Sequence, residues 1–242
     1  MSTDLNFKVQ KIQFALFPKD FDLVSNPSEI AHNLKQKINY LLDGEETISS
    51  LIGAPSEIPR IILQSKNRVF RCEIAISRID FFQELGEISE SNFIEIRDDY
   101  LLKTKQIYSY FINDMDLSIG RIGFVIDFFT DLPINESSNK LLQNKLFKRD
   151  SFLAKMEKLK NILLVFTEET KINSLDINKL IKIETLRKKD NPENNRRLSL
   201  RYDVNTILEK KQEYNLTVTE IENFLKGVSE EEDISVLNKI FN

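Results

Sequence analysis

The sequence predicts an α+β protein with a largely antiparallel sheet of about six or seven strands and helices packed mainly on one face. Strand-like runs follow one another closely, as 60–65 and 68–82 do across the short join Lys66-Asn67. Connections this short link antiparallel strands into hairpins. Segments with helical spacing stand between groups of strands and not after every strand, which favours this class over a regular parallel α/β arrangement.

The N-terminal part predicts a strand, a helix and a loop. Residues 7–17 alternate imperfectly between apolar and polar side chains, which is typical of a half-buried strand. At 26–29 the chain reads Asn-Pro-Ser-Glu, a grouping in which an N-cap, a first-turn proline and a glutamate three residues on begin a helix. The stretch 44–59 contains two glycines and two prolines and therefore predicts a loop.

The middle of the chain predicts a long strand, a helix and a central strand. Residues 68–82 form the second strand of the first hairpin, with Cys72 and Ile74 on its core face, because alternate residues of a strand share a face. A helix is predicted at about 98–112. Residues 118–130 are the strongest central strand, since apolar side chains occupy both faces towards their end.

Beyond Pro133 the chain becomes rich in lysine, and 137–160 predicts a helix. Capping-box spacing after Thr217 and again after Ser229 predicts two closing helices, with Gly227 ending the first. Three further strands are predicted at 161–167, 178–187 and 197–206.

The length and composition predict one domain. With 242 residues, 41% of them hydrophobic, a single α+β domain over 1–242 is expected, and a subdivision would fall near 133–160. No apolar run approaches the roughly 18–20 residues that cross a bilayer, so no membrane association is expected. The start of the chain has no signal-peptide pattern, and the lone cysteine, Cys72, favours a reducing cytoplasm.

The order of these elements resembles that of a known family. The similarity rests on the RIILQSKNRVFRCEIAISRIDFF hairpin, the SIGRIGFVIDFF strand and the RLSLRYDVNT strand that precedes short helices. Together they resemble a family of sporadically distributed, uncharacterised bacterial proteins of about this length, and the resemblance covers nearly the whole chain. It implies a bacterial protein, and it brings no catalytic residues with it.

Several chemistries are disfavoured by residue types alone. One histidine, His32, and one cysteine, Cys72, are too few for the usual zinc sets. The glycine-rich phosphate loops are absent. Gly120 and Gly123 have the spacing of a nucleic-acid clamp, but strand-like residues flank them, so we interpret them as a place of close packing. No cofactor and no metal site is expected.

Two carboxylates have an enzymatic interpretation as well as a structural one. Asp80 and Asp127 each end an apolar run near a basic residue, Arg78 and Arg121 respectively. If both met in a cleft, they could hold Mg²⁺ for hydrolysis. Buried ion pairs are the favoured interpretation for both.

Charge is segregated along the chain. Residues 1–139 have 14 basic and 21 acidic side chains, 140–211 have 18 and 10, and 212–242 have 2 and 7. Within the middle block, six basic residues crowd a loop predicted between two strands, and they are the candidate binding residues: Arg187, Lys188, Lys189, Arg196, Arg197 and Arg201.

These observations favour a non-catalytic cytoplasmic interaction protein that recognises a protein partner, or associates with itself, through its sheet face or the basic hairpin. The first alternative is nucleic-acid binding through 187–201, since basic hairpins can follow a phosphate backbone. Few aromatic residues lie among these charges and the isoelectric point is about 5.4, which weighs against it. The second alternative is the carboxylate or metal-dependent enzyme.

Overall fold

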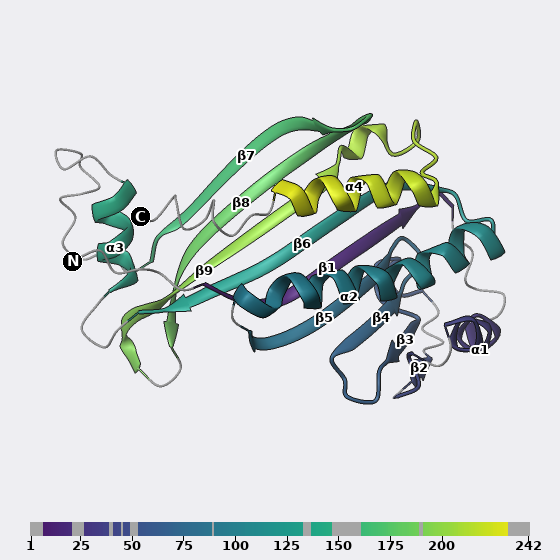
Figure 1. Ribbon diagram of the computed structural model, residues 1–242, viewed down its shortest axis with the longest axis horizontal. Helices are drawn as coiled ribbons and strands as arrows, with labels where there is room; N and C mark the ends of the chain where they lie inside the picture. The colour runs from purple at the N-terminus through teal and green to yellow at the C-terminus, as the bar shows by residue number, and fades with distance from the viewer. Residues whose placement is uncertain are drawn as a thin grey trace.

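A computed structural model describes residues 7–20, 27–38, 41–44, 46–48, 53–88, 90–132, 137–146, 161–188 and 191–231. Its centre is an antiparallel sheet in the order β2-β3-β4-β5-β1-β6-β9-β8-β7 (Figure 1). The strands are β1 (Lys8–Pro18), β2 (Glu46–Ile48), β3 (Ile61–Gln64), β4 (Phe70–Ile74), β5 (Ile79–Ile88), β6 (Ile119–Asp131), β7 (Leu163–Ile172), β8 (Leu175–Lys188) and β9 (Asn191–Thr206). The predicted α+β class with an antiparallel sheet is confirmed.

The predicted number of six or seven strands is wrong, because the described residues form nine. The run 68–82 is two strands, β4 and β5, since the chain turns at 75–78, where the amide of Ala75 donates to the carbonyl of Arg78 at 2.9 Å. The additional strand, β2, lies within the segment predicted as a loop and pairs with β3.

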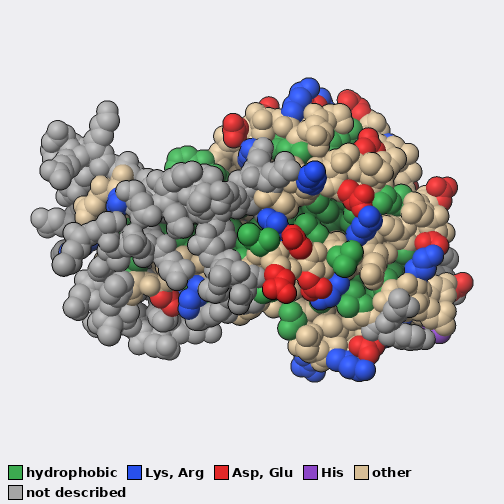
Figure 2. All heavy atoms as spheres, viewed as in Figure 1, with side chains coloured by type: hydrophobic (Ala, Val, Ile, Leu, Met, Phe, Trp, Pro, Cys, Tyr) green, Lys and Arg blue, Asp and Glu red, His purple; other side chains and the backbone are tan. Residues whose placement is uncertain are grey.

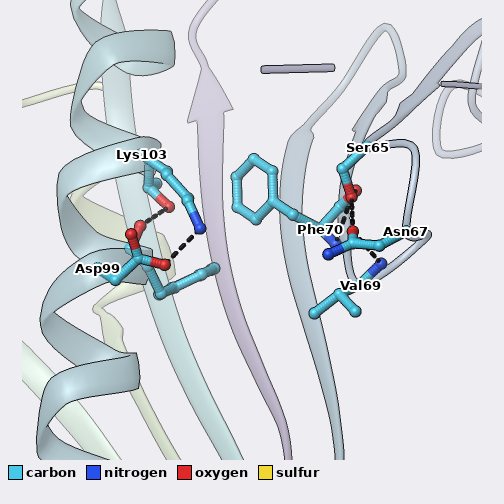
Figure 3. A network of polar contacts seen from close by, with 8 residues as sticks. Ser65, Asn67, Val69, Phe70, Asp99 and Lys103 are labelled. Atoms are coloured by element: carbon cyan, nitrogen blue, oxygen red, sulfur yellow. Dashed lines mark hydrogen bonds and ion pairs between the residues drawn. The ribbon is translucent and has the colours of Figure 1, made fainter. Parts of the chain in front are cut away.

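The hairpin between β3 and β4 is confirmed, and its turn is closed by side chains (Figure 3). The Oγ of Ser65 donates to Oδ1 of Asn67 at 2.7 Å, and the backbone amide of Phe70 donates to the same Oγ at 3.0 Å. Arg68 adopts a positive φ of 58° inside the turn. Short polar side chains that bond to nearby backbone make such turns without glycine.

The helices are α1 (Pro27–Lys37), α2 (Glu90–Ser109), α3 (Ser138–Leu146) and α4 (Val218–Glu231), with a π-turn η1 (Tyr110–Asp114) and a 3₁₀ turn η3 (Leu208–Lys210). Both α2 and α4 lie over the same face of the sheet (Figure 1). Two sequence expectations differ from this. Helix α2 begins earlier than residue 98, and α4 continues through Gly227, which does not end it. The predicted second closing helix, after Glu231, lies outside the described residues.

The core lies between the sheet and these two helices. Phe14 of β1 stacks on Phe81 of β5 with 5.8 Å between ring centroids, and it meets the ring of Tyr108 of α2 edge-on at 6.0 Å. Because strand side chains alternate, the residues between these core positions point to the opposite face of the sheet. We call that opposite face, represented by Lys11, Asp127 and Arg201, the outer sheet face.

Candidate functional site

The six predicted basic residues do not form a loop. Arg187 and Lys188 belong to the end of β8, while Arg196, Arg197 and Arg201 belong to β9. The remaining residue, Lys189, lies outside the described residues. The predicted loop is wrong because β9 begins at Asn191, well before the predicted start at 197, and pairs with the end of β8, with Arg187 opposite Asn195 and Lys188 opposite Asn191.

Two of these arginines are engaged in ion pairs within the chain. Arg197 binds Asp131 through two hydrogen bonds of 2.8 and 3.0 Å, and its guanidinium lies 4.3 Å from the centre of the Phe129 ring. Arg201 binds Asp127 in the same bidentate way, and these hydrogen bonds raise the pKa of the Arg201 guanidinium. Such forked pairs satisfy the donors that a phosphate would otherwise use.

The outer sheet face arranges further charges in rows across the strands. The strand register places Lys11, Asp127, Arg201 and Lys182 side by side on β1, β6, β9 and β8. Lys11, Asp127 and Arg201 alternate in charge, and opposite charges on neighbouring strands stabilise a sheet, so these three residues have a structural role. Lys182, which lies opposite the like-charged Arg201, binds Glu184 of its own strand at 2.8 Å. Lys182 is opposite Val165 of β7, where the row reaches the edge of the sheet.

Asp80 and Asp127 do not converge. On the strand between them, β1, Asp80 is opposite Ala15 and Asp127 is opposite Lys11, four residues apart. That separation is about 13 Å along the strand, too far for two ligands of one ion. Among the described residues, no three metal-binding side chains lie close enough to hold an ion.

Each of these carboxylates has a cationic partner. Arg78 binds Asp80 through two contacts of 2.5 Å, as the sequence predicts. The partner of Asp127 is Arg201, not Arg121. Arg121 lies instead over the Phe17 ring, 4.5 Å from its centre.

His32 and Cys72, the remaining residues of types that often act in catalysis, differ in their exposure to solvent. His32 is exposed on α1 and contacts Gln36 at 2.9 Å. Cys72 is completely buried, and burial raises the pKa of its thiol well above the ordinary value. A buried neutral thiol is a poor nucleophile.

The feature that the sequence analysis missed is the edge strand β7. Leu163, Val165 and Phe166 are exposed to 54%, 52% and 52%. In the described part of the chain β7 pairs only with β8, so its other edge has unpaired backbone groups. Natural sheets cover or charge such an edge, and apolar side chains on an open one mark a site of strand pairing.

The charges along β7 are unevenly distributed. Its first four residues, 163–166, are all apolar, whereas Glu168, Glu169 and Lys171 follow in the second half. The usual protection by charged side chains is therefore present in one half of the edge and missing in the other. We call residues 163–167 the open edge.

None of the helices within the described residues has both the length and the apolarity that crossing a membrane requires.

Comparison with known proteins identifies no family. No family model matches the sequence, and no curated protein is significantly similar to it. Among solved structures, the chain is distantly similar to the di-domain ARO/CYC StfQ from the steffimycin biosynthetic pathway. The match has a TM-score of 0.19 and 9% identity, and covers 75% of this chain and 72% of that chain.

Proposed function

We propose that this chain is a non-catalytic interaction protein that recognises its protein partner by strand addition at the open edge of β7. The observation behind this proposal is the exposure of Leu163, Val165 and Phe166 on a strand whose outer backbone groups have no partner among the residues that the structure describes. In strand addition, main-chain hydrogen bonds supply affinity and alternate side chains supply specificity. The partner that fits best is a second copy of the chain.

The argument for a second copy is that the open edge is complementary to itself. An antiparallel pair with its two-fold axis at Val165 places the two copies of Val165 opposite each other. Leu164 then lies opposite Phe166 of the second copy, and Leu163 lies opposite Thr167. Directly opposite residues share a face of the sheet, so apolar side chains meet on both faces. A two-fold axis is also the commonest symmetry of protein dimers.

The charges on β7 disfavour registers centred on its second half. If the axis moved to Glu168 or Glu169, these carboxylates would lie opposite their own copies. Like charges directly opposite each other destabilise a sheet. In the register centred on Val165, Glu168 lies opposite Ile162 and Glu169 opposite Asn161, and no carboxylates face each other.

A location in the cytoplasm belongs to the same proposal. It is supported by the single cysteine, Cys72, which is buried as a free thiol. Nucleic-acid binding through the basic hairpin has less support, because Arg197 and Arg201 are held by Asp131 and Asp127.

Light scattering over a concentration series tests the proposal, with Val165→Lys as the disrupting variant. The contact is small, so we expect a dissociation constant on the order of 10 µM, the range of weak interfaces. Val165→Lys places two lysines opposite each other and should leave only monomer. Leu208→Lys is the matched control, because Leu208 is exposed to 58% but lies far along the chain in η3.

A wild-type chain that stays monomeric at every concentration would overturn the choice of a second copy. A dimer that persists in Val165→Lys would place the contact elsewhere. Equal loss of the dimer in Val165→Lys and Leu208→Lys would show a general effect of surface charge, and would also contradict the proposal.

A further inference from the structure

A groove of about 600 Å³ lies between α2 and α4, on the helical face and away from the open edge. Nη1 of Arg97, early in α2, lies 3.4 Å from the carbonyl oxygen of Ser229, late in α4. Lys105, further along α2, pairs with Glu222, nearer the start of α4, so the two helices are antiparallel. Hydrophobic side chains appear between charged ones where these helices lie (Figure 2). Volumes of this size are typical of small-molecule sites.

The charged side chains that line the groove already have partners. The Asp98 carboxylate accepts two hydrogen bonds, of 3.2 and 3.0 Å, from Arg97. The Lys105 ammonium is paired with Glu222, and Lys226 has a partner as well. A charged ligand would lose its hydration here without gaining a counter-ion, so the lining favours a neutral molecule.

The middle of the groove is apolar. Leu101 and Leu102 of α2 and Leu225 of α4 line it. Leu225 is buried, while Leu102 is exposed to 60%. A leucine so exposed on a helix gains by being covered, so this part suits an aliphatic chain.

The hydroxyl of Tyr108 is a polar group of the groove that lacks a partner. The residue is only 1% exposed, and its hydroxyl makes no hydrogen bond with any residue that the structure describes, yet the oxygen keeps accessible surface in the groove. A hydroxyl that is buried without a hydrogen bond is costly, so a ligand oxygen that reaches it gains affinity. The Oγ of Ser229 also lacks a partner in the described part of the chain, but it has no accessible surface for a ligand to contact.

Tyr108 can act as a donor over a wide range of pH. Burial, together with the nearby Glu222 carboxylate, raises the pKa of its phenol, so the hydroxyl stays protonated. Leu101 and Tyr108 are seven residues apart on α2, which is two turns, and they therefore share a face of the helix about 10 Å apart. A ligand whose oxygen meets Tyr108 can extend its apolar part to Leu101.

We propose that this groove binds a neutral, mainly aliphatic molecule with one oxygen function, which accepts a hydrogen bond from the Tyr108 hydroxyl while the chain lies along the three leucines. A chain of about eight carbons has the required length, since single carbon–carbon bonds are about 1.5 Å long. The site is independent of β7 and of the proposed self-association.

Titration with octan-1-ol, followed through the leucine methyl resonances in NMR spectra of the full chain, tests the site. We expect saturable shifts of Leu102 and Leu225, with a dissociation constant on the order of 1 mM for so small a ligand. Leu102→Glu should abolish binding, because the new carboxylate would lie beside the aliphatic chain. Leu208→Glu, at a similarly exposed leucine outside the groove, should leave binding unchanged.

Charged ligands of the same length test the preference for a neutral molecule. At neutral pH, octanoate and octylammonium should each bind at least about tenfold more weakly than octan-1-ol, because the charged lining residues are already paired with one another. Octanoate that binds as tightly as the alcohol would overturn the neutral class of ligand.

Substitution of the tyrosine tests the hydrogen bond. Tyr108→Phe should weaken the binding of octan-1-ol about three- to tenfold, the contribution of one hydrogen bond. Tyr110→Phe, at a second buried tyrosine that does not line the groove, is the matched control and should leave the affinity unchanged. Thermal denaturation checks that both variants are folded.

Absence of saturable binding, or equal loss in Leu102→Glu and Leu208→Glu, would overturn the site. An affinity for octan-1-ol that is unchanged in Tyr108→Phe would overturn the role of the hydroxyl. None of these results depends on whether the chain forms dimers.

Discussion

The Arg201 guanidinium of β9 donates hydrogen bonds of 2.6 and 2.9 Å to the Asp127 carboxylate of β6, and the two residues are directly opposite each other in the sheet. This ion pair joins two strands at positions that lie more than seventy residues apart along the chain. It also explains why the most basic part of the chain does not present all its charge to a ligand. The positive block at 140–211 neutralises carboxylates of the acidic first part.

The first prediction concerns this pair. Arg201→Ala and Asp127→Asn should each destabilise the fold by about 1 kcal/mol, and the double variant by clearly less than their sum, because the two side chains share one interaction. Urea denaturation of the four proteins measures the coupling. A coupling energy of zero would show that the pair contributes nothing to stability.

The second prediction concerns pH. Burial raises the pKa of Asp203 above its ordinary value of 3.8. The folded state therefore binds the proton of the Asp203 carboxyl more tightly than the unfolded state does. The stability that this proton contributes is fully present below pH 3.8 and is lost as the pH rises through the pKa of the folded state. The substitution Asp203→Asn avoids this loss of stability, because the amide does not become charged as the pH rises.

We accordingly expect Asp203→Asn to be more stable than the wild type at about pH 7 and equally stable at about pH 3. The side-chain amide of Asn205, which donates to Asp203, can still donate to the new carbonyl. Asp20→Asn, at an exposed aspartate, controls for the change in net charge. A variant less stable than the wild type at pH 7 would contradict the direction of the shift.

The third prediction separates the two glycines of β6. A Cβ at Gly120 would clash with the backbone carbonyl of Lys211, whereas a Cβ at Gly123 would meet side-chain atoms, the nearest being Oδ1 of Asn205. A side chain can rotate away and a backbone carbonyl cannot. Gly120→Ala should cost about 2–3 kcal/mol and Gly123→Ala less than about 1 kcal/mol. Thermal denaturation measures both, and equal costs would refute the distinction.

The fourth prediction concerns the only cysteine. Cys72 is buried with a raised pKa, so a thiol reagent can reach it only when the protein opens. We expect the labelling rate to follow the unfolding equilibrium as urea is added. Rapid labelling without denaturant would show that β4 and β5 separate easily.

The class of fold was accessible from sequence because periodicity and short connections report directly on antiparallel strands. The turn at 75–78 was not, because apolar alternation continues through Ala75 and Ile76 without glycine or proline to mark it. At Gly227 the sequence predicts a helix end that the structure does not have. It continues α4 because its missing side chain makes room for Ile172 of β7.

The candidate sites were less accessible. The run Ile162–Phe166 is continuously apolar, which is typical of a strand buried on both faces, and nothing within the run itself indicates that it forms an edge. Its position follows from long-range pairing of β7 with β8 alone. The acidic residues Glu168 and Glu169 are the signal that was available, since charges of this kind protect an exposed strand.

A charge-swap experiment at Val165 tests the proposed self-recognition most directly. Val165→Lys and Val165→Glu should each sediment as monomers when alone, because like charges then face each other across the two-fold axis. Mixed in equal amounts, the two variants should form a dimer, because lysine now lies opposite glutamate. A wild-type dimer accompanied by a mixture that stays monomeric, or by single variants that still dimerise, would contradict pairing at this position.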